Sequence, residues 1–166
     1  ELVIERLTGQ PYPHYVSPAM AEGTARESDA RVEFEFEKGK SVVEAGFIPH
    51  PTIAMAGGSP DGLVDDGQGL IEIKCPLAAT HWEYLKSGII PGEYLKQITH
   101  AMWVTGAQWC DWMSFHPDFP EALRAKIVRV PRIEQDIAEY HASAMTFLAE
   151  VETVCHAILT LAGATI

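Results

Sequence analysis

The sequence predicts an α/β fold in which helices flank a mixed sheet, arranged as one domain over residues 1–166. Segments with strand-type alternation are interspersed with segments of helical periodicity, which is typical of this class. No internal repeat, low-complexity tract or linker divides the chain. A chain of 166 residues with 47% hydrophobic and 21% charged residues has the length and composition to bury a substantial core.

The first predicted helix covers residues 17–38. Ser17 is a suitable N-cap, Pro18 fits the first helical position and Gly39 follows the last polar turn. The alternation over residues 32–37 also suits a strand, and Gly23 offers a point at which the helix could break. The sequence therefore leaves open where the helix ends and whether it breaks near Gly23.

Short strands are predicted next, over residues 42–48 and 53–55, separated by a turn at Pro49-His50-Pro51. A hairpin follows, in which Gly62–Val64 and Leu70–Cys75 are joined by the loop of residues 65–69. That loop reads Asp-Asp-Gly-Gln-Gly, which has the residue types that tight turns require.

The second half of the chain predicts three more helices and two strands. Helical periodicity covers His81–Lys86 and Pro91–Val104, and Gly106 can end the second of these. Residues 108–115 and 126–130 are rich in aromatic and β-branched side chains, which favour strands. A long amphipathic helix is expected over residues 133–161.

Composition narrows the class of protein. The net charge of -11 is mild evidence against nonspecific coating of DNA, although a local basic groove stays open. Cys75, Cys110 and Cys155 are too few and too far apart for a disulfide framework or a four-cysteine metal site, which suits a reducing cytoplasm. We expect no membrane span and no signal peptide. Because the chain begins at Glu1, a short native N-terminal segment is expected upstream.

The most informative segment is the acidic hairpin around Asp61. Side chains on a strand alternate between faces, so Glu72 and Lys74 share one face while Ile71 and Ile73 take the other. Carboxylates are the usual ligands of Mg²⁺, and a lysine beside such an ion can orient a water. By itself this spacing is weak, because an aspartate in a turn and a Glu-x-Lys pair recur in many ordinary proteins.

The chain resembles a known family, the lambda-type phage exonucleases. These are alkaline nucleases of viral recombination within the PD-(D/E)xK, restriction-endonuclease-like superfamily. The matching stretches occur in the family's order between Gly9 and about Glu152, and they read GQPYPHYVSPAMAEGTARESDARVEFEF, SPDGLVDDGQGLIEIKCP and YLKQITHAMWVT. The resemblance implies a restriction-endonuclease-like core.

The resemblance also implies an activity. It is a metal-dependent 5′-to-3′ exonuclease that acts on double-stranded DNA ends, releases 5′-mononucleotides and leaves a 3′ overhang for recombination by strand annealing. Mg²⁺ is the expected cofactor, with Mn²⁺ as a substitute and two ions in each active site. A homotrimeric ring and a single-strand annealing protein are the expected assembly and partner, without a membrane.

Transferred by position, the resemblance implies that Asp61 and Glu72 bind metal together with the Ile73 backbone carbonyl. Glu27 matches a further acid near the metals. Taken alone, Glu27 is an ordinary exposed helix acid.

Three other residues receive roles from the same resemblance. Lys74 matches the residue that positions or activates the attacking water, Gln97 an active-site glutamine, and Ser59 a serine that contacts the terminal 5′ phosphate. The seven histidines show no metal-ligand spacing, and we read them as surface or packed side chains, with His14 as the one to watch.

Two alternatives remain open. The superfamily motif also fits a structure-specific or restriction-type endonuclease. A catalytically inactive DNA-binding module is the third reading, and its mark would be the loss of a metal acid or of the lysine, all of which are present here.

Overall fold

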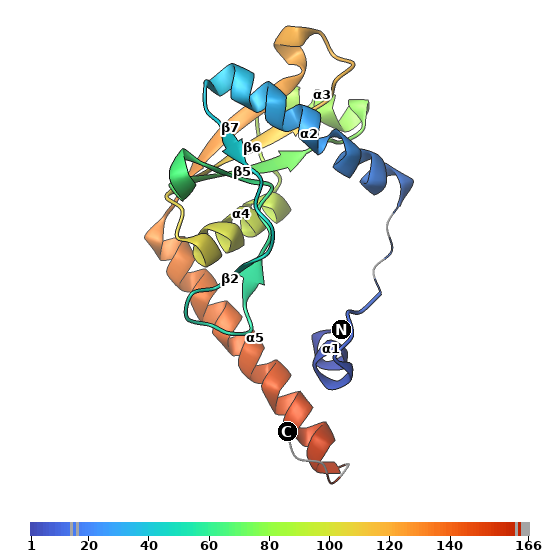
Figure 1. Ribbon diagram of the computed structural model, residues 1–166, viewed down its shortest axis with the longest axis vertical. Helices are drawn as coiled ribbons and strands as arrows, with labels where there is room; N and C mark the ends of the chain where they lie inside the picture. The colour runs from blue at the N-terminus through green and yellow to red at the C-terminus, as the bar shows by residue number, and fades with distance from the viewer. Residues whose placement is uncertain (14, 16, 162, 164–166) are drawn as a thin grey trace.

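The computed structural model describes residues 1–13, 15, 17–161 and 163. Its centre is a five-stranded mixed sheet with the order β1-β4-β5-β6-β7 (Figure 1). The central strands β5 and β6 run parallel and every other neighbouring pair is antiparallel. The strands are β1 (Val42–Val43), β4 (Gly62–Val64), β5 (Gly69–Lys74), β6 (Trp109–Phe115) and β7 (Ala125–Pro131). The predicted class, a mixed sheet flanked by helices, is confirmed.

Helix α2 (Pro18–Lys38) covers one face of this sheet. Its Ala30 and Phe34 are fully buried in a cluster with Ile71 and Ile73 of β5. The helix runs without a break through Gly23, so the helical interpretation of residues 17–38 is confirmed. The burial of Ile71 and Ile73 against α2 directs Glu72 and Lys74 to the other face, as strand alternation predicted.

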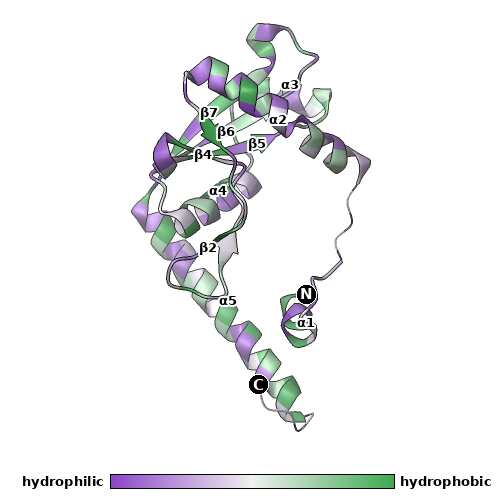
Figure 2. Ribbon diagram, viewed as in Figure 1, coloured by the Kyte–Doolittle hydropathy of each residue, from purple (hydrophilic) through white to green (hydrophobic). Residues whose placement is uncertain are grey.

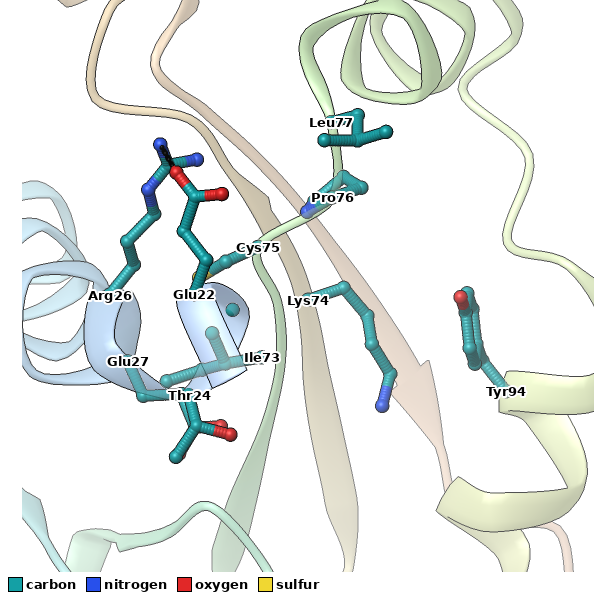
Figure 3. Close-up of a pocket in the computed structure, with 11 residues that line it drawn as sticks. Glu22, Thr24, Arg26, Glu27, Ile73, Lys74, Cys75, Pro76, Leu77 and Tyr94 are labelled. Carbon is teal, nitrogen blue, oxygen red and sulfur yellow. Dashed lines mark hydrogen bonds and ion pairs between the residues drawn. The ribbon is translucent and has the colours of Figure 1, made fainter. Parts of the chain in front are cut away.

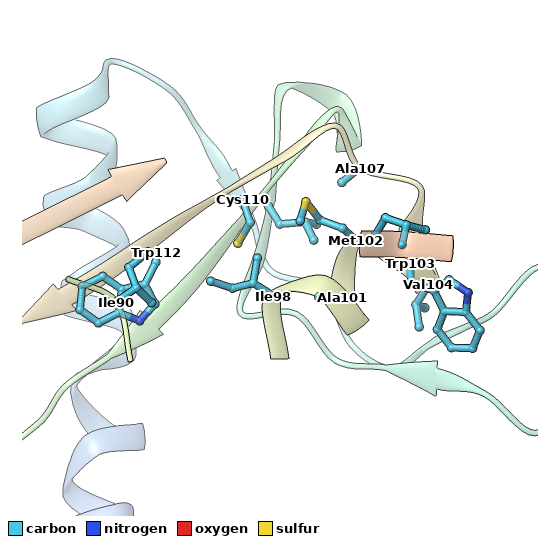
Figure 4. Close-up of a cluster of buried hydrophobic side chains, with 11 residues drawn as sticks. Ile90, Ile98, Ala101, Met102, Trp103, Val104, Ala107, Cys110 and Trp112 are labelled. Atoms are coloured by element: carbon cyan, nitrogen blue, oxygen red, sulfur yellow. The ribbon is translucent and has the colours of Figure 1, made fainter. Parts of the chain in front are cut away.

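Helix α4 (Gly92–Thr105) covers the opposite face. Figure 4 shows Ile98 and Met102 of this helix beside Cys110 and Trp112 of β6. Each of these side chains is at most 3% exposed, so α4 is held firmly against the sheet. Because α4 is anchored this way, side chains at its N-terminal end have a fixed position relative to β5.

Helix α5 (Glu134–Leu161) packs outside α4 and extends well beyond the sheet (Figure 1). The short helix α1 (Leu2–Thr8) lies along its outer half, where Arg6 Nη1 is 2.6 Å from Glu152 Oε2. Apolar residues are interspersed along both helices, and several are exposed (Figure 2). Helix α1 was not predicted, because seven residues are too few for a clear periodicity and its contacts are with a distant part of the chain.

By length and composition alone, α5 is apolar enough to cross a membrane, which departs from the expectation drawn from the sequence. Core helices of soluble proteins pass the same test, so this is weak evidence.

The strand predicted over residues 42–48 is wrong in its extent. Only β1 joins the main sheet, where Val42 and Val43 pair with Val64 and Leu63. The partner β4 has three residues, and it is bounded by the buried Pro60 and by the turn at Asp65, so it offers no partner for a longer strand.

The strand predicted over residues 53–55 is also wrong. His50 Nδ1 accepts hydrogen bonds from the backbone N–H groups of Thr52 and Ile53, each at 3.2 Å, and Ala56 N–H donates to the Ile53 carbonyl oxygen at 3.0 Å. These bonds fold the segment into a turn. The turn connects β2 (Ile48–Pro49) to β3 (Gly57–Gly58), which form a separate two-stranded sheet.

The remaining elements agree closely with prediction. The acidic hairpin forms as expected: β4 and β5 pair antiparallel, and Asp65, Asp66 and Gly67 have positive φ in a 3₁₀ turn between them. Helix α3 (Ala78–Ser87) begins three residues before the predicted start at His81. A second 3₁₀ turn, Glu121–Leu123, precedes β7. His14 lies outside the described residues.

Candidate active site

The acidic hairpin brings Asp61 to the C-terminal half of β5. Asp61 comes directly before β4, one position beyond the pair formed by Gly62 and Ile71, and it therefore lies next to Glu72. Its Oδ2 accepts a hydrogen bond from the Ile73 N–H at 2.6 Å. This bond holds a carboxylate from the loop against the backbone of the strand that carries Glu72 and Lys74.

Glu72 is the most buried acid of the group, with 3% of the residue exposed. Its Oε1 is 2.6 Å from Lys74 Nζ, which makes an ion pair, yet among the described residues no donor meets this oxygen with hydrogen-bond geometry. Burial raises the pKa of Glu72 to about 7; the negative charge of Asp61 adds to the shift and the ammonium of Lys74 opposes it. The site therefore holds a carboxylate that gains from an additional cation.

Lys74 is fixed by three groups from two elements. Besides Glu72, its Nζ donates to Gln97 Oε1 at 3.2 Å and lies 4.8 Å from the centre of the Tyr94 ring. Figure 3 shows Lys74 extending from β5 toward Tyr94 on α4. Gln97 and Tyr94 are three residues apart on α4 and so lie on one face of the helix. The structure brings Lys74 and Gln97 together, and it adds Tyr94, which sequence reasoning missed.

Glu27 lies on α2 across a pocket of about 330 Å³ that Lys74 and Tyr94 also line (Figure 3). Burial is the main cause that raises the pKa of Glu27, and the charge of Asp61 contributes next. Burial likewise raises the pKa of Asp61, although its bond to Ile73 N–H opposes the shift. The three acids Glu27, Asp61 and Glu72 are therefore close enough to influence one another's ionisation.

Ser59 is exposed and stands two residues before Asp61. The preceding Gly57 and Gly58 have close neighbours: a Cβ at Gly57 would collide with the Phe47 ring, and one at Gly58 would lie 3.2 Å from His100 Nε2. Glycine is required here because a ring packs against each residue. The segment that carries Ser59 is consequently held at a defined position before the hairpin.

The oxygen donors of the site can be compared with those that a divalent metal needs. Among the described residues, no three acidic, histidine or cysteine side chains converge closely enough to bind an ion by themselves. Mg²⁺ does not need such a cage, because it uses one or two carboxylates and completes its shell with waters and substrate phosphates. The carboxylates of Asp61 and Glu72 are hard oxygen donors, and Glu72 Oε1 is buried without a directed donor. This arrangement fits Mg²⁺ or Mn²⁺.

Comparison with solved structures gives two matches at 42% identity and a TM-score of 0.91, each covering 98% of this chain and 82% of the other. Both are of the alkaline exonuclease LHK-Exo from Laribacter hongkongensis, one of them in complex with dAMP. A phage-related exonuclease from Haemophilus somnus 129PT is 15% identical with a TM-score of 0.64, over 92% of this chain and 80% of that one, and shares the fold.

No curated protein sequence matches this chain. The profile of the YqaJ-like viral recombinase domain matches residues 1–108, which include the acidic hairpin, β5 and all of α4. That match and the structural likeness to an alkaline exonuclease agree with the resemblance found in the sequence. The chain belongs to the family of YqaJ-like viral recombinase domains.

Proposed function

We propose that this chain is a divalent-metal-dependent exonuclease that digests one strand of duplex DNA from its 5′ end and releases 5′-mononucleotides. The observation that carries the proposal is the connected group of Asp61, Glu72, Lys74 and Gln97 at the end of β5. The 42% identity to a protein described as an alkaline exonuclease supports it.

Asp61, Glu72 and the Ile73 carbonyl would hold one Mg²⁺ or Mn²⁺, and Glu27, with Asp61, a second. When bound, such ions neutralise charge on the scissile phosphate and stabilise the leaving 3′ oxygen. The hydrogen bond from Ile73 N–H fixes one oxygen of Asp61 and leaves the other available to bind the metal.

Lys74 would position the attacking water. Its Nζ donates one N–H to Gln97 Oε1 and forms an ion pair with Glu72, so at least one of its three N–H groups remains to donate to the water oxygen. That donation directs the water toward the phosphorus atom while the ion pair with Glu72 keeps the ammonium in place. Gln97 acts on the chemistry by fixing Lys74.

Ser59 would donate its hydroxyl to the terminal 5′ phosphate. Ser59 is exposed and lies two residues before Asp61. This position suits a contact with the terminal 5′ phosphate while the next phosphodiester along the strand is hydrolysed at the metal-binding acids. A site that reads a terminal phosphate selects DNA ends over internal positions.

We extend the proposal to the biological setting. Digestion from 5′ ends leaves a 3′ overhang, the substrate for a single-strand annealing protein, and the viral recombinase family supports this role. A homotrimeric ring around DNA would retain the enzyme on its substrate. Residues 1–166 would act as one exonuclease domain in the cytoplasm.

The test is digestion of linear duplex DNA carrying 5′ phosphates, with covalently closed circular DNA in the same tube. With Mg²⁺ we expect the linear DNA alone to disappear as mononucleotides, and with chelator we expect no digestion. Cutting of the circle would favour a structure-specific or restriction-type endonuclease. Binding of DNA without digestion under any divalent ion would favour an inactive module.

A further inference from the structure

A chain of hydrogen bonds runs from α5 through α4 to the segment that carries Ser59. His100 Nε2 is 3.0 Å from the Gly57 carbonyl oxygen, and His100 Nδ1 is 2.8 Å from the Tyr140 hydroxyl. A carbonyl oxygen only accepts, so Nε2 carries the proton and Nδ1 accepts from Tyr140. Tyr140 therefore fixes both the tautomer and the orientation of the His100 ring.

The His100 ring also packs against the backbone that it binds. A Cβ at Gly58 would meet both Nε2 and Cδ2 of His100, at 3.2 and 3.4 Å, so the ring lies directly on this glycine. On the preceding residue, the Phe47 ring occupies the space where a side chain at Gly57 would stand. The two glycines are held between these rings, with Ser59 immediately after them.

The same helix reaches the catalytic lysine. His100 follows Gln97 by three residues on α4, so both side chains project from one face of the helix. Gln97 binds Lys74 while His100 binds Gly57. Helix α4 thus sets the distance between the lysine at the end of β5 and the segment that carries Ser59.

We infer that His100 and Tyr140 are positioning residues that hold the Gly57–Ser59 backbone so that the Ser59 hydroxyl meets the terminal 5′ phosphate. This inference rests on the proposed function and adds to it the determinant of preference for phosphorylated ends. Neither residue touches the reacting atoms. Because they act by holding the backbone, we expect them to affect recognition of the terminal phosphate rather than the hydrolysis step.

The experiment compares duplexes with 5′-phosphate and 5′-hydroxyl ends under Mg²⁺, with kcat and KM measured for each. For His100→Ala we expect KM on phosphorylated ends to rise roughly tenfold, the equivalent of one lost hydrogen bond, with a smaller change in kcat. Rates on hydroxyl ends should change little, so the preference ratio falls. His100→Gln, which keeps an N–H near the Nε2 position, should recover part of the preference, and Tyr140→Phe should lose part of it.

His141→Gln is the matched control. His141 is an exposed histidine on α5, and its Nδ1 accepts a hydrogen bond from Trp103 Nε1 at 3.2 Å, whereas the Gly57 carbonyl oxygen is bound by His100. We expect the preference ratio of this variant to equal that of the wild type. Equal losses on both kinds of end in His100→Ala, or an unchanged ratio, would overturn the inference and leave the exonuclease proposal standing.

A second readout does not depend on activity. Amide hydrogen exchange over residues 56–61, measured without DNA, should be faster in His100→Ala and Tyr140→Phe than in wild type and His141→Gln. If wild-type protein digests no DNA, the proposed function fails, and this exchange alone decides whether His100 holds the segment. Unchanged exchange would overturn the inference whatever the activity.

Discussion

Asp61 Oδ2 accepts a 2.6 Å hydrogen bond from the Ile73 N–H, and this contact joins the loop acid to the strand that carries Glu72 and Lys74. The bond uses one carboxylate oxygen of Asp61 and holds this acid beside the strand. The Asp61 carboxylate provides both a hydrogen-bond acceptor for Ile73 N–H and a negative charge, and substitutions can remove one without the other.

Asp61→Asn keeps an oxygen that can accept from Ile73 N–H but removes the charge. We expect the melting temperature to stay near that of wild type while nuclease activity falls by roughly 100-fold or more. Asp61→Ala should lose the activity and also some stability, because the Ile73 N–H then loses its partner. Substantial activity in Asp61→Asn would reject Asp61 as a metal-binding acid.

In the proposed mechanism Gln97 acts through Lys74, because its Oε1 accepts a hydrogen bond from Lys74 Nζ at 3.2 Å. In Gln97→Leu the lysine loses one of the groups that orient it, and we expect kcat to fall roughly tenfold with a smaller change in KM. Thr99→Val is the control on the same helix, because Thr99 Oγ1 donates only to the Leu95 carbonyl oxygen. A lowered kcat in both variants would show a general effect on α4.

Stability should depend on metal and pH together. Burial raises the pKa of Glu72 to about 7 from an ordinary value of 4.5, so the folded state favours the neutral acid. The stability that the raised pKa of Glu72 contributes is fully present below pH 4.5 and is lost as pH rises through 7. In the proposed function Mg²⁺ binds the ionised form of Glu72, and we therefore expect the ion to raise the melting temperature by a few degrees at pH 8 and less at pH 6.

Glu72→Gln is the control for that measurement. The amide cannot ionise, so the variant should show little dependence on Mg²⁺ at either pH. A melting temperature that responds to Mg²⁺ equally in both proteins would place the ion elsewhere.

The environment of His81 leads us to expect a separate loss of stability at acid pH. It is fully buried, its Nδ1 accepts from Ser114 Oγ at 2.7 Å and its Nε2 donates to the Leu123 carbonyl oxygen at 2.9 Å. Burial lowers the pKa of His81, so its neutral form stabilises the fold above the ordinary value of 6.5, and this stability declines as pH falls below that value. Urea denaturation from pH 8 to 5 should show the decline.

Ser114→Ala tests the same network at neutral pH. It leaves His81 Nδ1 buried without a donor, and we expect the free energy of unfolding to drop by about 1–3 kcal/mol. A loss within experimental error would mean that the bond between Ser114 and His81 contributes little.

The long elements of the fold were predictable from local patterns, and the short ones were not. Capping residues predicted α2, periodicity with the terminal Gly106 predicted α4, and amphipathic periodicity predicted α5. The Asp-Asp-Gly turn predicted the hairpin of β4 and β5. The extent of β1 depends on its short partner β4, and the turn after Pro49 depends on the His50 side chain capturing two N–H groups. The length of a partner strand and a hydrogen bond between a side chain and the backbone depend on the folded structure, so a short stretch of sequence does not reveal them.

The residues of the candidate site likewise fall into those that local patterns predict and those that they do not. Strand alternation alone placed Glu72 and Lys74 on one face, whereas Glu27 and Gln97 come from helices and were assigned only through the family resemblance. Tyr94 and His100 were missed, although both lie in the stretch YLKQITH at helical spacing from Gln97. That spacing was the available signal, because residues three apart on a helix lie on one face.

The most direct measurement uses a linear duplex labelled at the 5′ end of one strand and the 3′ end of the other. With Mg²⁺ and wild-type protein, we predict that the 5′ label leaves first, as a mononucleotide, and that Lys74→Ala releases neither label. Early release of the 3′ label, release in longer fragments, or release that persists in chelator would contradict a metal-dependent 5′-to-3′ exonuclease.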